Sequence, residues 1–326
     1  MKAMILTKFG SPDGFRLMDV PKPTPKDNEI LIKICATSIT AGDTEIRGLT
    51  LPLLFAIPIR LFLEFSKGSN KILGQELAGI VEETGKDVTQ FKKGDAVFGT
   101  SGFGLGGYAE YICLPAQSED RALALKPTNV TFEQAAVVPT AGLEALHFLR
   151  LANIQKGAKV LVFGAGGSIG TFGVQLAKHF GAEVTGLDSS VKMDTLRSIG
   201  ADHVIDYTKE DFTRNGEAYD VIFDVIGKSS FSGCIRSLKP NGCYLMANFK
   251  PSYLIRRLFV SGGKKVIMGS AIQSSKDLTY LKELIEAGTI KPVIDRDFLL
   301  EQIADAHRYA ESGKKKGNIA ITVAAT

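Results

Sequence analysis

The sequence predicts an α/β protein in which a β-rich module and a doubly wound parallel sheet share one chain. Three observations predict this class. Short β-rich runs fill residues 1–125, strands and helices alternate after about residue 130, and a glycine-rich loop joins a buried strand to a helix. With 326 residues, the chain is long enough for two domains and a sizeable core.

Residues 1–125 predict an antiparallel, barrel-like module of short strands bounded by Gly, Pro or Asp turns. The expected strands are Met4–Lys8, Glu29–Ala36, Gly79–Glu83, Asp95–Gly99 and Tyr108–Leu114. A further strand-like run, Asn318–Val323, is too isolated to extend the later parallel sheet. We expect it to return to the first module.

The chain after residue 130 predicts a parallel sheet. A helix is expected over Thr131–Leu151, and strands are expected over residues 159–163, 183–187, 203–207, 219–225 and 243–248. The apolarity of these strands is continuous rather than alternating, which favours a sheet covered on both faces. Two amphipathic helices are expected after about residue 270, and Gly288 is expected to cap the C-terminus of the first.

The loop 164–170 predicts a dinucleotide site. Gly164, Gly166, Gly167 and Gly170 lie between the buried strand and the next helix. Such glycines allow a tight turn, a close approach to a pyrophosphate and close packing of helix on strand. The helix N-terminus attracts a diphosphate through its N–H groups and its partial positive charge.

Asp188 ends the following strand at about the separation from Gly164 expected for the acidic residue that bonds the adenosine ribose. A carboxylate there repels a 2′-phosphate, so NADH is favoured over NADPH, although Lys192 lies near enough in sequence to weaken the repulsion. Alternatively, Asp188 caps the helix that starts near Ser190, and both roles are compatible.

Composition and charge exclude several classes of protein. The net charge is only +4, so no nucleic-acid surface is expected. The four cysteines contain no CxxC pair, which argues against a zinc knuckle or a disulfide framework. No signal peptide is visible, and the apolar segment 51–65 is too short to span a bilayer, so we expect a cytoplasmic protein.

Further motifs follow in order along the chain. GQELAGIVEETGKDV (74–88) matches the signature G-H-E-x2-G-x5-G-x2-V at all but one position, and GGYAEYICLP (106–115), GADHVIDY (200–207) and YDVIFDVIG (219–227) come after it. In these motifs the chain resembles the medium-chain dehydrogenase/reductases, and in particular their zinc-independent quinone oxidoreductase-like branch. The resemblance covers nearly the whole chain. It implies a GroES-like catalytic domain (1–124 and 272–326), a Rossmann domain (125–271) and nicotinamide-dependent hydride transfer.

The chain departs from its zinc-dependent relatives at the metal ligands. The positions that hold catalytic zinc in those relatives are occupied here by Thr40, Gln75 and Thr140, and neutral Thr and Gln are poor zinc ligands. The stretch of the structural zinc lobe, between Gly99 and Cys113, keeps only its last cysteine. We therefore expect no metal site, and we expect the four histidines to be surface or core residues.

Without zinc, a substrate carbonyl must be polarised by hydrogen bonds. The candidate donors are Thr40, Gln75 and the backbone N–H groups near 226–227 and 247–248, after strands of the parallel sheet. Gln75 and Glu76 are interpreted as a polar floor below the nicotinamide, or alternatively as a turn pair satisfied by backbone. Asp43 is the acid of its motif, in a catalytic or a structural role, and no general acid is identified.

The resemblance also implies the ligands and the assembly. We expect a small apolar enone or quinone as substrate, with Leu53, Leu54, Phe55 and Phe62 lining its pocket or packing as a plain helix. The family is often dimeric through Rossmann edge strands, so the run 264–270 predicts a homodimer. The alternatives are a metal-dependent alcohol dehydrogenase and a nucleotide-binding sensor or interaction protein without turnover. The residues expected at the cofactor are Thr140, Gly164, Gly166, Gly167, Ser168, Ile169, Gly170, Asp188, Ser189, Lys192, Tyr207, Val225, Ile226, Gly227, Ala247 and Asn248.

Overall fold

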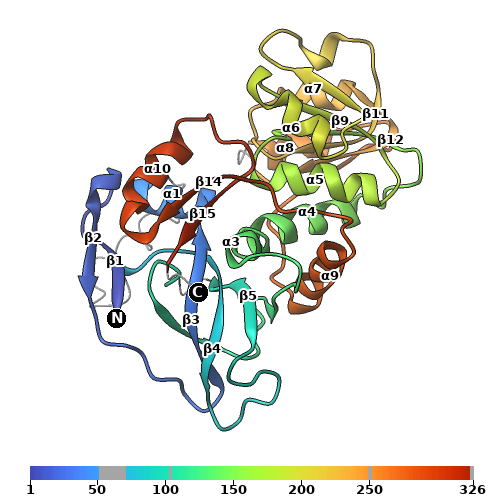
Figure 1. Cartoon of the computed structure of the whole chain (residues 1–326). Helices are drawn as coiled ribbons and strands as arrows, with labels where there is room; N and C mark the ends of the chain where they lie inside the picture. Colours follow the sequence, from blue (N-terminus) through green and yellow to red (C-terminus); the bar gives the residue numbers. More distant parts are fainter. Residues whose placement is uncertain (51–70, 103–104, 249–251, 324–326) are drawn as a thin grey trace. The chain divides into compact units, whose positions relative to one another are not determined.

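The computed structural model of the chain describes residues 1–50, 71–102, 105–248 and 252–323, and it divides into two compact units (Figure 1). The first unit comprises Met1–Thr140, Gln273–Glu286 and Ile294–Thr326, and the second comprises Ala141–Ile272 and Ala287–Val293. The boundaries predicted from the sequence, after residues 124 and 271, remain a proposal, because a compact unit need not coincide with a domain.

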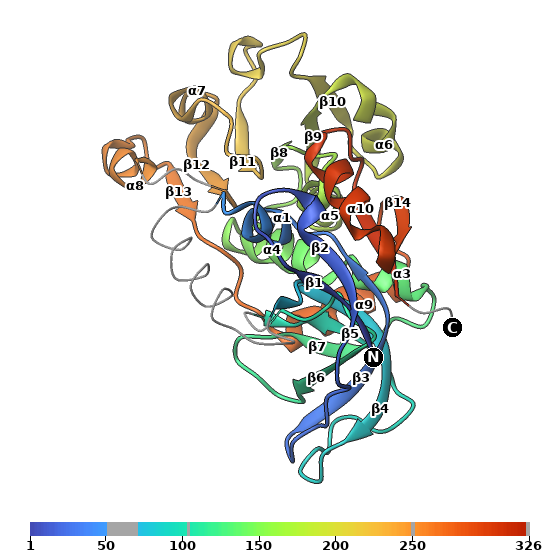
Figure 2. The ribbon, with the colours of Figure 1, turned by 90° about the vertical axis from the view of Figure 1, so that its left-hand side faces the viewer.

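The first unit is built on a mainly antiparallel sheet with the strand order β14-β15-β3-β4-β5-β7, in which β6 also pairs with β3. Figure 2 shows β3 and β4 running side by side as its longest strands. A separate hairpin joins β1 to β2. The strands are β1 (Lys2–Leu6), β2 (Phe15–Asp19), β3 (Glu29–Ser38), β4 (Glu76–Thr84), β5 (Ala96–Thr100), β6 (Tyr111–Pro115), β7 (Leu123–Leu125), β14 (Ile294–Leu299) and β15 (Asn318–Thr322).

The C-terminal strand returns to the first unit as the sequence predicts. β15 pairs antiparallel with β3 on one side and parallel with β14 on the other. The helices of this unit are α1 (Ala41–Gly48), α3 (Phe132–Ala136), α9 (Ser275–Glu286) and α10 (Ile303–Glu311), with short 3₁₀ turns at Pro12–Gly14 and Leu300–Gln302.

The second unit contains a six-stranded parallel sheet in the order β10-β9-β8-β11-β12-β13. Numbered from its first strand, β8, this is the order of doubly wound dinucleotide-binding sheets, with the switch point between β8 and β11. The sheet therefore confirms the predicted α/β class. The strands are β8 (Lys159–Phe163), β9 (Glu183–Asp188), β10 (His203–Asp206), β11 (Tyr219–Asp224), β12 (Leu238–Met246) and β13 (Lys265–Met268).

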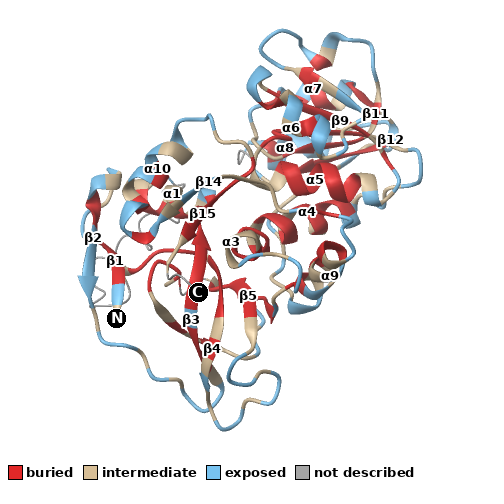
Figure 3. Ribbon diagram, in the orientation of Figure 1, coloured by how far each residue is buried: buried red, intermediate tan, exposed pale blue. Residues whose placement is uncertain are grey.

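The helix that packs most deeply in the second unit follows the glycine loop. In α5 (Ser168–His179) an unbroken run from Gly170 to Ala177 is buried, as the red ribbon in Figure 3 shows. The other helices are α6 (Met193–Ser198), α7 (Phe231–Arg236) and α8 (Tyr253–Arg256), with 3₁₀ turns at Ser190–Lys192, Phe212–Arg214 and Arg257–Phe259. No helix among the described residues combines the length and apolarity that crossing a bilayer requires.

The predicted helix over Thr131–Leu151 is wrong in one respect, because it is two helices. α3 starts where expected, with Thr131 and Gln134 forming a capping box, and ends at Ala136. α4 (Pro139–Leu151) then begins at a proline. Proline lacks an N–H and disfavours helical geometry in the residue before it, so it ends one helix and suits the first position of the next.

Candidate active site

The first part of the candidate site is the N-terminus of α1, which two residues build together. Thr40 is the N-cap, and its hydroxyl accepts a hydrogen bond from the Asp43 N–H at 3.1 Å. The Asp43 carboxylate returns a bond to the Thr40 N–H, with 2.9 Å between Oδ2 and N. This capping box fixes both side chains, because each satisfies a backbone group that the helix leaves unpaired.

Gln75 lies against this helix end, just before β4. Its amide oxygen Oε1 is 2.7 Å from the Thr40 hydroxyl, which also lies 2.7 Å from Asp43 Oδ2. Gly42 makes the approach possible: a Cβ there would lie 2.4 Å from Gln75 Oε1. Gln75 is half-buried, whereas Thr40 and Asp43 are buried, so Gln75 is the most exposed of the three residues. The structure thus brings together the three residues predicted as catalytic.

Asp43 is fully buried, and burial raises its pKa from 3.8 to about 6, against the lowering effect of its hydrogen bonds to Thr40, Gly74 and Tyr108. The Gly74 N–H donates to its Oδ1 at 3.1 Å. Behind it, the Tyr108 hydroxyl lies 3.3 Å from Nε2 of the buried His307 on α10. Sequence reasoning missed this buried chain from His307 to Asp43. Tyr108 did carry a signal, since it stands in the GGYAE motif.

Glu76 is buried, and its carboxyl group already has hydrogen-bond partners. Its side chain accepts hydrogen bonds from the Ser38 hydroxyl and from the Thr140 N–H, the latter at 2.8 Å. Burial raises its pKa from 4.5 to about 7. Glu76 therefore fits the second interpretation, in which the side chain is satisfied inside the protein, whereas Gln75 is only half-buried.

The three residues at the zinc positions do not fit a zinc site. Thr40 and Gln75 hydrogen-bond to each other, and both are neutral. Thr140 approaches Glu76 through its backbone N–H. Zinc sites in proteins use thiolate, imidazole or carboxylate ligands, and no group of three or more such side chains is placed to hold a metal in the part of the chain that the structure describes.

The second part of the candidate site is the glycine loop after β8. Gly164 has a positive φ of 83°, and a Cβ there would lie 2.4 Å from Ile226 in the loop after β11. A Cβ at Gly170 would lie 2.1 Å from the Gly164 carbonyl oxygen. The N-cap residue of α5, Gly167, provides no side-chain cap. A loop this close to its neighbours, at a helix N-terminus without a side-chain cap, fits the diphosphate of a dinucleotide.

Asp188 is more constrained than its predicted role suggests. It is 2% exposed, its Oδ2 accepts from the Gly166 N–H at 2.9 Å, and its Oδ1 accepts from the Ser189 N–H at 2.8 Å. Lys192 Nζ lies 3.2 Å from Oδ1, and the Lys192 stem crosses over Gly166. Asp188 thus ties the glycine loop to β9, and the ammonium of Lys192 offsets its charge. The alternative role as a helix cap is not seen, because Ser189 is the N-cap of the next turn.

The loop after β11 corrects one expectation. The N–H groups of Ile226 and Gly227 both donate to Asp224 Oδ1, at 3.1 and 2.8 Å, and the Ala247 N–H donates to the Asp224 carbonyl at 3.2 Å. These three groups already have acceptors, so in this conformation they are excluded as donors to a substrate carbonyl. Sequence reasoning missed Asp224, which is fully buried and also accepts from Tyr244 at 2.9 Å.

Three more predicted residues follow strands of the parallel sheet, and one predicted segment lies outside the described residues. Tyr207 is 48% exposed after β10, its ring centroid 6.0 Å from that of Phe163 at the end of β8. Val225 and Asn248 follow β11 and β12, on the carboxyl side of the sheet. Residues 51–65, predicted to line a substrate pocket, lie outside the described residues.

Family models match both halves of the chain. The model described as alcohol dehydrogenase GroES-like domain matches residues 26–125, and the model described as zinc-binding dehydrogenase matches residues 199–321. A 2-methylene-furan-3-one reductase of Solanum lycopersicum is 31% identical over 98% of this chain and 79% of its own length. The chain belongs to the medium-chain dehydrogenase/reductase superfamily. A quinone oxidoreductase of Sus scrofa is 31% identical over 94% of this chain and 93% of its own length. This similarity places the chain in the quinone oxidoreductase-like branch of the superfamily.

Solved structures of this family agree with the fold. The quinone oxidoreductase from Coxiella burnetii has a TM-score of 0.88 and 29% identity, and covers 99% of both chains. The Escherichia coli quinone oxidoreductase complexed with NADPH has a TM-score of 0.81 and 26% identity, and covers 99% of this chain and 100% of its own. The first unit is therefore GroES-like, and the six-stranded sheet of the second unit is Rossmann-like.

Proposed function

We propose that this medium-chain dehydrogenase/reductase is a zinc-independent NAD(P)H-dependent reductase of apolar enones or quinones. The observation that carries the proposal is the hydrogen bond between Thr40 and Gln75. These two neutral side chains occupy positions that coordinate the metal in zinc-dependent relatives. Relatives named as reductases of furanones, alkenals and quinones support the substrate class.

Bound NAD(P)H would supply the hydride, from C4 of its nicotinamide, to the β-carbon of an enone or to a quinone. The residues that would hold its diphosphate are those of the loop Gly164–Gly170, and Asp188, Lys192 and Tyr207 would meet its adenosine end. In this proposal Gln75, in the first unit, donates a hydrogen bond to the substrate oxygen. Such a donor is worth about 3–4 kcal/mol once negative charge develops on that oxygen.

The preference for NADH remains a prediction, and the structure weakens its physical basis. Asp188 would disfavour a 2′-phosphate only if its charge were free to act. Here Lys192 lies 3.2 Å from Asp188 Oδ1, and two N–H groups bond the carboxylate. We therefore propose that both dinucleotides bind, and competition between NADH and NADPH for the purified protein would measure the preference.

The test of the function is oxidation of NADH and NADPH by the purified protein with a panel of small quinones and enones, followed by the absorbance of the reduced nicotinamide. Turnover that is unchanged by metal chelation supports the proposal. Dinucleotide binding without turnover across the panel would instead favour a sensor or interaction protein. Stoichiometric bound zinc would favour an alcohol dehydrogenase.

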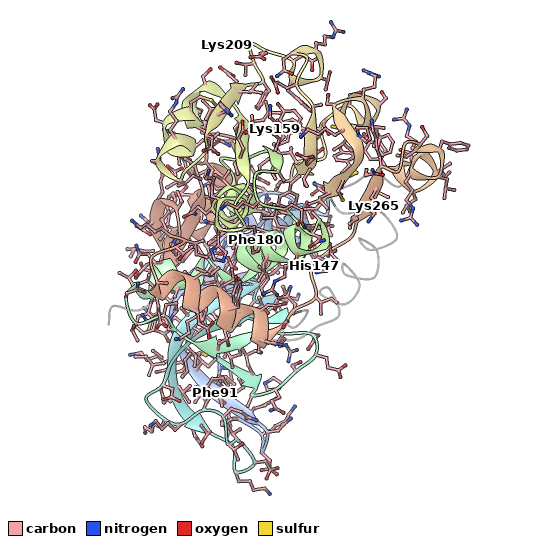
Figure 4. All side chains as sticks on the ribbon, turned by 90° about the vertical axis from the view of Figure 1, so that its right-hand side faces the viewer. Phe91, His147, Lys159, Phe180, Lys209 and Lys265 are labelled. Carbon is pink, nitrogen blue, oxygen red and sulfur yellow. The ribbon has the colours of Figure 1, made fainter. Side chains whose placement is uncertain are left out.

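The proposed homodimer has one structural support. β13 is the last strand of the second unit's sheet, and Figure 4 shows the Lys265 side chain on it. An edge strand offers unpaired backbone groups to a second copy. Sedimentation of the purified protein tests this, and a monomer at micromolar concentration would contradict it.

A further inference from the structure

Thr40 is the branch point of the network in the first unit, because its hydroxyl has two possible acceptors and only one proton. Asp43 Oδ2 and Gln75 Oε1 both lie 2.7 Å from Thr40 Oγ1. The same hydroxyl also accepts from the Asp43 N–H. A hydroxyl donates one hydrogen bond and accepts two, so Thr40 can donate to Asp43 or to Gln75 but not fully to both.

The protonation state of Asp43 decides between the two. An ionised Asp43 only accepts, so it takes the Thr40 proton. The hydroxyl can then only accept a hydrogen bond from Gln75. The Gln75 amide must therefore place its N–H₂ group, rather than its oxygen, against Thr40. A protonated Asp43 instead donates to Thr40 from Oδ2, and the hydroxyl donates onward to Gln75 Oε1. Because the amide oxygen and nitrogen are nearly the same size, the amide group fits the same space after a rotation that exchanges them.

We infer that Asp43 is a positioning residue that determines, through the single hydroxyl proton of Thr40, whether Gln75 presents its amide N–H₂ or its amide oxygen to a bound substrate. This inference rests on the proposed function, in which Gln75 faces the substrate oxygen. With Asp43 protonated, Gln75 offers a donor to the developing enolate. With Asp43 ionised, Gln75 offers a lone pair, which repels that oxygen.

The groups around Asp43 limit what else can titrate. Tyr108 hydrogen-bonds to Asp43, and burial raises its pKa well above the ordinary value. Burial and the nearby Arg47 lower the pKa of His307 to about 3, so His307 is neutral at higher pH. Arg47 itself is buried and paired with Glu311, at the far end of α1 from Thr40. Charged Asp43 also raises the pKa of Glu76, which among the described residues near Asp43 is the remaining group that titrates in the same range.

Glu76 does not contact Thr40 in the hydrogen-bond network, and this allows the two carboxyls to be separated. Its partners are the Ser38 hydroxyl and both the N–H and the side chain of Thr140. An ionisation of Glu76 therefore persists when the Thr40 hydroxyl is removed. An effect of Asp43 that passes through the hydroxyl does not.

The experiment compares the wild type with Thr40→Val, which keeps the shape but removes the hydroxyl, and with Thr40→Ser, which keeps the hydroxyl. The wild-type kcat/KM for an enone should fall by about 100-fold as pH rises through about 6, because an oxyanion donor is lost. Thr40→Ser should keep this inflection and Thr40→Val should lose it. An inflection that survives in Thr40→Val would overturn the inference.

A second measurement does not depend on turnover. The side-chain amide resonance of Gln75, assigned by its absence from Gln75→Glu, should shift with pH at the same inflection in the wild type and in Thr40→Ser, and should stay constant in Thr40→Val. A pH-independent wild-type resonance overturns the inference even if Thr40→Val does not fold. If the resonance shifts but no substrate turns over, the proposed function fails and the coupling of Asp43 to Gln75 stands.

Discussion

Replacing Gly42 by alanine is expected to disable Gln75 without unfolding the protein. A Cβ at residue 42 would lie 2.4 Å from Gln75 Oε1 and 2.9 Å from both Cδ and Nε2. These separations are too short for non-bonded atoms. Because the atoms that clash are the end of a flexible side chain, the amide of Gln75 should move and break its bond to Thr40, while the backbone stays in place.

Gly42→Ala should change the stability of the protein little and its activity strongly. Alanine is favoured over glycine within a helix by about 1 kcal/mol, and the lost hydrogen bond costs about 1 kcal/mol. These effects oppose each other, so the free energy of unfolding of Gly42→Ala should stay within about 1 kcal/mol of the wild type. Displacing the proposed donor should lower kcat/KM by about 100-fold, the usual cost of losing one oxyanion donor.

Gly48→Ala is the matched control, because residue 48 belongs to the same helix and a Cβ there meets nothing closer than 3.4 Å. The assays are chemical denaturation and steady-state reduction of an enone. Full activity in a folded Gly42→Ala would refute the role of Gln75. Equal losses of activity in both variants would trace the effect to the helix rather than to the amide.

Three further predictions address the cofactor loop and the buried carboxyl. Gly170→Ala should lower the free energy of unfolding by about 1–3 kcal/mol, because the added Cβ would lie 2.1 Å from the Gly164 carbonyl oxygen; an unchanged denaturation midpoint would contradict this packing. Lys192→Ala should weaken NADPH binding about tenfold more than NADH binding, since it leaves Asp188 unopposed beside a 2′-phosphate; parallel losses in titrations with the two dinucleotides would contradict it. Glu76→Gln should change how stability depends on pH. The folded pKa of Glu76 is raised from 4.5 to about 7, so its contribution is present in full below about 4.5 and is lost as pH rises through about 7. Relative to the glutamine variant, the wild type should lose about 3 kcal/mol over that window in denaturant unfolding, and parallel curves for the two proteins would count against it.

The sequence predicts the second unit's sheet well because burial on both faces leaves a strong signal. The run of apolar residues 159–163 coincides with β8, and the run 183–187 falls one residue short of β9. β2 and β14 were not predicted, because most of their residues are exposed or only partly buried, so no apolar pattern marks them. Local chemistry, rather than the hydrophobic pattern, splits the helix at Pro139.

The candidate site shows the same limit. Thr40, Asp43 and Gln75 could be named from motifs, and the Thr40–Asp43 cap is local in sequence. Tyr108 and His307 are in contact although 199 residues separate them in the sequence, and neither local sequence indicates this contact. The occupied N–H groups after β11 were mispredicted for a related reason. A motif can locate a backbone N–H group, but only the structure shows that this group already donates a hydrogen bond to Asp224.

The return of β15 to the first unit has a consequence for biosynthesis. Residues 141–272 of the second unit leave the ribosome well before β15, which consists of the residues 318–322. The Rossmann-like sheet can thus fold while translation continues, whereas the end of β3 at residues 36–38 must wait for β15, because β6 pairs only residues 29–33 on that side of β3. Until then the backbone groups at this end of β3 lack partners on one side, so chains without β15 should be prone to aggregation.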